Sequence, residues 1–125
     1  MATKIVFDNE QEAVFIKLAG YINPGQMLKE TKNLVSNPLF NNIRKSLNDV
    51  STADFSDITA AEFESHAHYC ASKLKGLKIA IYAPTDLLFG ISRRFEMMST
   101  KKNILIAREM KEALSWLDVT LPKDF

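Results

Sequence analysis

The sequence is poor in the residues that cross-link small proteins, and it has no excess of charge. Its 125 residues include one cysteine, so no disulfide can form within the chain. Sixteen basic and fifteen acidic side chains give a formal net charge of +1, too little for a field that attracts nucleic acid or an anionic membrane. No segment approaches the roughly 20 consecutive apolar residues of a membrane span. The N-terminus reaches Lys4 and Asp8 before any signal-like apolar run. These absences predict a soluble, cytoplasmic protein with no membrane span and no nucleic-acid partner.

The composition otherwise matches that of an ordinary globular protein. Hydrophobic residues make up 46% of the chain and charged residues 25%. A chain of this length can bury about two thirds of its unfolded surface, so it can build a core without metals or disulfides. We therefore expect one domain over residues 1–125.

Apolar residues recur with strand and helix periods in turn. Alternation predicts strands over 4–7 and 13–19, joined as a hairpin across a polar gap. Further strands are predicted over 43–50, 77–83 and 103–107, with a small polar segment over 51–57. Helices are predicted from Asn23-Pro24 to the stop at Asn37-Pro38, from Thr59 to Gly76, over 84–98 and over 109–117.

This order of elements predicts the fold class. Strands that alternate with helices after an initial hairpin indicate an α/β domain. Its sheet is mostly parallel with an antiparallel N-terminal edge hairpin, and the helices pack on it. Residues 118–125 have no period and are expected to form an irregular C-terminal tail.

Three residues that can bind zinc stand one turn apart on the second predicted helix, namely Glu62, His66 and Cys70. Packing also explains them, because Cys70 belongs to the apolar stripe and Glu62 forms a capping box with Thr59. A nucleophile at Cys70 with His66 would lack an orienting third group. We therefore predict no metal, no cofactor, no catalytic residues and no enzyme activity.

The third predicted helix carries the strongest functional signal. If its apolar stripe faces inward, Phe89, Arg93 and Met97 lie on the outer side with Glu96, as in a protein-contact surface. The alternative is that Phe89 covers the strand edge and Arg93 pairs with Glu96. Asp49 joins these candidates because it is predicted to end a parallel strand, where open α/β sheets bind ligands.

Four stretches together resemble one protein family. They are Asn-Asp-Val at 48–50, Lys-Ile-Ala-Ile-Tyr-Ala-Pro at 78–84, Phe-Gly-Ile-Ser-Arg at 89–93 and Glu-Ala-Leu-Ser-Trp-Leu at 112–117. The pattern resembles the small bacterial SpoIIAA-like, or STAS-like, proteins over almost the whole chain. The resemblance implies a β/α superhelix. It also implies one of two functions, a partner-switching regulator of the anti-anti-sigma type or a lipid-exchange protein that holds an apolar ligand.

The sequence departs from the regulator pattern at its phosphorylation site. The family's Asp-Ser-Ser-Gly run is replaced by Asp-Phe-Ser-Asp-Ile-Thr at 54–59. Ser56 and Thr59 are the remaining candidate phosphoacceptors, at a helix start that would favour a dianion. The carboxylates of Asp54 and Asp57 would oppose that charge, so the pattern does not favour a phosphorylation switch.

The leading prediction is a non-enzymatic binding or regulatory module that acts through protein contacts, as a homodimer or with another protein. The alternative is a carrier of a small apolar or lipid-like ligand, held between helices and sheet. The side chains proposed to line such a site are aromatic residues and methionines, namely Phe15, Tyr82, Phe89, Phe95, Met97 and Met98.

Overall fold

A computed structural model describes residues 2–99 and 103–125 of the chain. Within them lie the strands β1 (Ala2–Asp8), β2 (Ala13–Tyr21), β3 (Lys45–Asp54), β4 (Lys78–Tyr82) and β5 (Ile104–Ala107). The helices are α1 (Pro24–Ser36), α2 (Ala60–Lys73), α3 (Asp86–Ser99) and α4 (Met110–Leu117), with a 3₁₀ turn, η1 (Pro38–Asn42), after α1. No helix in the described ranges is both long and apolar enough to cross a membrane.

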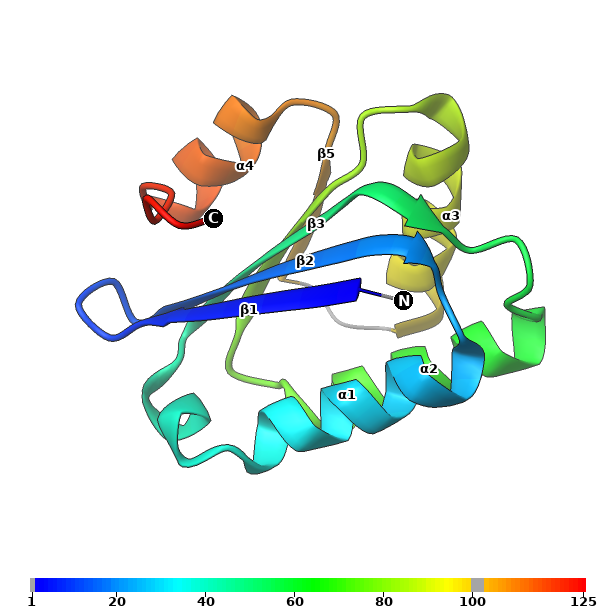
Figure 1. Cartoon of the computed structure of the whole chain (residues 1–125), viewed down its shortest axis with the longest axis horizontal. Coiled ribbons are helices and arrows are strands. Elements are labelled where there is room, and N and C mark those ends of the chain that lie inside the picture. Colours follow the sequence, from blue (N-terminus) through cyan, green and yellow to red (C-terminus); the bar gives the residue numbers. More distant parts are fainter. Residues whose placement is uncertain (1, 100–102) are drawn as a thin grey trace.

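The five strands form one sheet in the order β1-β2-β3-β4-β5. β1 pairs with β2 antiparallel, and every later pair is parallel. The predicted α/β fold with an antiparallel N-terminal hairpin is therefore confirmed. Parallel crossovers are almost always right-handed, so successive crossovers that advance in one direction place their helices on the same face. Accordingly, α1 and α2 lie together on one side of the sheet and α4 lies on the other (Figure 1).

Alternate residues of the strands supply two hydrophobic cores. On the side of α1, α2 and α3, Val14 and Ile16 of β2 join Ile79 and Ile81 of β4 in one buried cluster. On the side of α4, buried strand and helix side chains form a second cluster, which consists of Ala13, Phe15, Leu47, Ala80, Ala107, Ala113, Leu117 and Val119. The sheet is thus covered on both faces, and the larger covering is that of α1–α3.

The structure corrects the predicted course of the chain after residue 50. β3 continues to Asp54, although its last residues are small and polar, because β2 also continues and pairs Ala19–Tyr21 with Thr52–Asp54 after a register shift. The turn η1 was not predicted; the side chain of Asn37 caps it by accepting a hydrogen bond from the Leu39 amide. The predicted capping box is confirmed, since Thr59 and Glu62 each bond to the other's main-chain amide.

Candidate functional site

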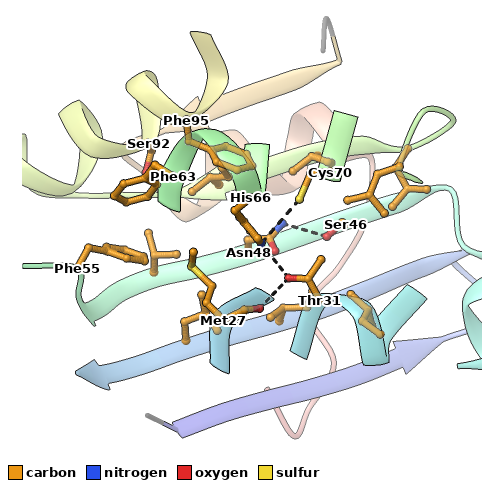
Figure 2. Close-up of a pocket in the computed structure, with 18 of the residues that line it drawn as sticks. Met27, Thr31, Ser46, Asn48, Phe55, Phe63, His66, Cys70, Ser92 and Phe95 are labelled. Carbon is orange, nitrogen blue, oxygen red and sulfur yellow. Dashed lines mark hydrogen bonds between the residues drawn. The ribbon is translucent and has the colours of Figure 1, made fainter. Parts of the chain in front are cut away.

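A cavity of about 130 Å³ lies between the sheet and helices α1, α2 and α3. β2, β3 and β4 form its floor, and the three helices, η1 and the connections that follow β3 and α2 form the rest of its wall. Figure 2 shows the side chains that line it. Its lining is mostly apolar, with Phe55, Phe63 and Phe95 as large contributors. The polar side chains among the described lining residues are those of Thr31, Ser46, Asn48, His66, Cys70 and Ser92.

His66 links α2 to α1 across the cavity wall. Its Nε2 lies 2.9 Å from Thr31 Oγ1, and the Thr31 hydroxyl donates to the Met27 carbonyl at 3.1 Å (Figure 2). Because the single hydroxyl proton is directed to Met27, His66 Nε2 donates to Thr31. Cys70 Sγ is 3.8 Å from the same nitrogen. The Nε2–H group is thereby directed towards α1.

Burial keeps the His66 side chain uncharged at neutral pH. Removal of the ring from water lowers the pKa of His66 from 6.5 to about 4, because the charged form loses its hydration. The described lining contains no Lys, Arg, Asp or Glu side chain. The cavity is therefore electrically neutral at pH 7.

Asn48 and Ser92 bring polar atoms to the cavity that have no partner in the described protein. The Asn48 Nδ2 group donates to Ser46 Oγ at 2.9 Å and to the Ala80 carbonyl at 3.3 Å, which leaves Oδ1 without a hydrogen bond. The Ser92 hydroxyl makes none either, although only 5% of this residue is exposed. No fully buried side-chain N or O in the described ranges is unpaired. These two atoms must therefore border open space, which is the cavity that both residues line.

A second hollow, of about 260 Å³, adjoins the first. It is a groove formed by α3 and the chain from the end of β3 to the start of α2. Phe55, Phe63 and Ile91 line both the groove and the cavity. The two phenylalanine rings are 5.9 Å apart between centroids, so they form an aromatic pair between the two spaces.

Two predicted binding residues lie on the other face of the sheet. Asp49 and Tyr82 are in register on β3 and β4, at positions that alternate with the cavity-lining residues. Asp49 is not at a strand end, because β3 continues for five more residues, to Asp54. Its buried carboxylate accepts a hydrogen bond from the Ser51 amide at 2.9 Å, and Lys17 Nζ is 3.9 Å away. The structure thus brings Asp49 and Tyr82 together but separates them from the α3 candidates.

The three predicted residues of α3 differ in their exposure. Met97 is 73% exposed, and Arg93 is exposed and paired with Glu96 at 2.7 Å. Phe89 does not face outward as predicted. It is half-buried against the core, and the Arg108 guanidinium lies 4.4 Å from its ring centroid. The Arg93–Glu96 pair of the alternative interpretation is confirmed, while Phe89 packs against the core cluster.

The candidate metal and phosphate residues have local partners. Glu62 accepts hydrogen bonds from the Thr59 amide and hydroxyl, while His66 and Cys70 face the cavity. Residues 2–99 and 103–125 contain no group of three His, Cys, Asp or Glu side chains placed to hold a metal ion. Ser56 is exposed, and its amide donates to Asp54 Oδ1. Nothing in this geometry adds a phosphate-binding partner at Ser56 or Thr59.

The cavity lining differs from the predicted one. Of the six side chains proposed, Phe95 lines the cavity, Met98 lines the outer groove, and Phe15 lies in the core under α4. Tyr82, Phe89 and Met97 line neither space. The lining residues Thr31, Asn48 and Ser92 were not predicted. The one available signal was the pair Ser46 and Asn48, because polar residues two apart on a buried strand point to the same face.

Comparison of this chain with protein-family models and with curated proteins finds no match. The resemblance to SpoIIAA-like proteins therefore stays a prediction.

Proposed function

We propose that the protein binds a small, mainly apolar molecule in the cavity between its sheet and helices α1–α3. The observation that carries the proposal is a neutral, mostly apolar and partly open space of about 130 Å³ between the sheet and the helices of this domain. Protein interiors are normally packed as densely as organic crystals, with few voids larger than a water molecule. An engineered apolar cavity of about 150 Å³ in another protein binds benzene, so the space here suits a molecule of similar size.

The cavity is itself partly open, and the adjoining groove supplies a further route of access. The side chains of three residues line both spaces, namely those of Phe55, Phe63 and Ile91. Side-chain rotamer changes are much faster than movements of whole elements. A ligand of this size can therefore pass between the rings while the sheet and helices keep their places.

We expect toluene to bind wild-type protein as one molecule per chain with a Kd of about 0.2 mM. Its seven non-hydrogen atoms, at about 0.7 kcal/mol each, give about 5 kcal/mol, within the range for very small ligands. Titration followed by NMR measures this directly. Saturable shifts should cluster at cavity residues such as Met27, Cys70 and Ile91. Shifts that never saturate, or that spread over the surface, would contradict the proposal.

A protein-contact function is the second candidate, and the exposed apolar side chains of α3 favour it. Leu87 and Met97 are each 73% exposed, near the two ends of the same helix. Large apolar side chains that are this exposed are enriched where proteins meet. The partner that we propose for this surface is a second copy of the chain.

Arg93→Ala is expected to weaken such a dimer while changing the free energy of unfolding by less than about 0.5 kcal/mol. The Arg93–Glu96 pair is exposed and lies within one helix, and pairs of this kind contribute little to stability. Sedimentation velocity measures the dimer and thermal melting measures stability. A monomeric wild-type protein would remove the dimer, and a loss above about 1.5 kcal/mol would make Arg93 a structural residue.

A further inference from the structure

We infer that the ligand carries a neutral hydrogen-bond donor, as in a phenol or a short alcohol, and that Asn48 Oδ1 accepts the hydrogen bond from this group. The inference rests on the proposed function and specifies the chemical class of the molecule bound. It follows from the Asn48 amide oxygen on the cavity floor, which has no hydrogen-bond partner within the described ranges.

The orientation of the Asn48 amide is fixed by its neighbours. The Ala80 carbonyl can only accept a hydrogen bond, so the Asn48 nitrogen must face it, and Ser46 Oγ accepts the second amide proton. The oxygen is thereby directed away from both partners. β3 lies at the centre of the sheet, with β2 and β4 bonded on either side, so the backbone below Asn48 cannot shift to change this.

An oxygen in this position selects among apolar ligands. Enclosing Asn48 Oδ1 with a pure hydrocarbon would remove it from water without a replacement hydrogen bond, which is unfavourable. A ligand hydroxyl provides that bond, and its own oxygen remains free to accept. Ser92 offers a hydroxyl without a protein partner in the described ranges, on the helical side of the same cavity.

Ionised ligands are excluded because the described cavity lining offers them no opposite charge. The described lining has no acidic or basic side chain, and the pKa of His66 is lowered to about 4, so this residue is neutral at pH 7. A carboxylate or an ammonium would lose its hydration and meet no opposite charge. The proposed ligands are therefore neutral molecules with an apolar body and a hydroxyl group.

The test compares phenol and toluene, which have the same number of non-hydrogen atoms, in wild-type protein and in Asn48→Leu. Calorimetric titration at pH 7 gives a Kd for each ligand. Loss of the amide oxygen is expected to weaken phenol about tenfold relative to toluene, the usual effect of losing one buried hydrogen bond. Val50→Ala is the matched control, because Val50 is a cavity-lining neighbour on the same strand and has no polar group. It should change both Kd values alike. Benzoate is expected to bind at least about tenfold more weakly than phenol to wild-type protein.

The outcomes separate this inference from the proposed function. If neither toluene nor phenol binds with saturation, the proposed function fails. If both bind but Asn48→Leu leaves the ratio of their Kd values unchanged, the hydroxyl inference alone fails. Should Asn48→Leu not fold, the wild-type protein still decides, because the hydrogen bond should make phenol shift the side-chain amide resonances of Asn48 further than the ring current of toluene does. Equal shifts with both ligands would overturn the inference.

Discussion

Ser92→Leu is expected to stabilise the protein by about 2 kcal/mol and to abolish binding of toluene. Leucine adds three carbon atoms to a side chain that borders the cavity, and each buried CH₂ contributes about 0.8 kcal/mol. The change also removes a hydroxyl that has no partner among residues 2–99 and 103–125, and it places a better helix former in α3. For a chain of this size, the melting temperature should rise by about 5 to 8 °C.

Ser99→Leu is the matched control on the same helix. Ser99 is fully buried, it does not line the cavity, and its hydroxyl donates to the Glu96 carbonyl at 2.9 Å. Leucine there should overpack the core and destabilise the protein by about 1 to 3 kcal/mol. Opposite signs for the two serines would confirm a space next to Ser92 alone. A similar destabilisation by both would mean that no such space exists.

Acidification from pH 7 to pH 4.5 should reduce the free energy of unfolding by about 2 kcal/mol through His66 alone. The pKa of His66 is about 4 in the folded protein and 6.5 when the ring is exposed, because burial penalises the imidazolium. Between these values the unfolded chain binds the proton and the folded protein does not, so stability falls as the pH falls. The contribution of neutral His66 to the free energy of unfolding is fully present above pH 6.5 and is lost as the pH falls towards about 4.

His66→Gln isolates this effect, because its amide nitrogen can still donate to Thr31 and the side chain does not titrate. Urea unfolding of both proteins across pH 4.5–7 gives the difference in slope, and carboxylates that titrate in this range affect both alike. We expect the wild-type curve to lose about 2 kcal/mol more than the variant curve. Parallel curves would show that the folded protein accepts a proton on His66 as readily as the unfolded chain does.

Much of the fold was predictable because it follows from local pattern. Alternation around the polar gap at 8–12 predicts the hairpin, and the capping residues Asn23 and Thr59 mark helix starts that the structure confirms. Alternating strands and helices then allow little besides a mostly parallel sheet. The predicted stripe of α3 was partly right, since Leu88 is buried and Met97 is exposed.

The remainder depends on pairing and packing that no single segment encodes. Residues 51–54 become strand because the end of β2 pairs with them, whatever their own preference. Phe89 packs against the core, and Arg108, nineteen residues later, lies over its ring. The cavity is space that the side chains of three helices and the sheet leave unfilled. It therefore has no signature in the sequence of any one segment. Asn48 could be recognised as a polar residue facing the helices, but its unpaired oxygen appears only when Ser46 and Ala80 are in place.

A crystal structure of the protein equilibrated with xenon tests the cavity most directly. Xenon occupies apolar cavities of this size and needs no hydrogen bond. We expect xenon between the sheet and helices α1–α3, in contact with lining residues such as Ile81 and Phe95, and none in crystals of Ser92→Leu. A wild-type structure without xenon, in which the side chains around Asn48 and His66 close the space, would contradict the proposed binding site.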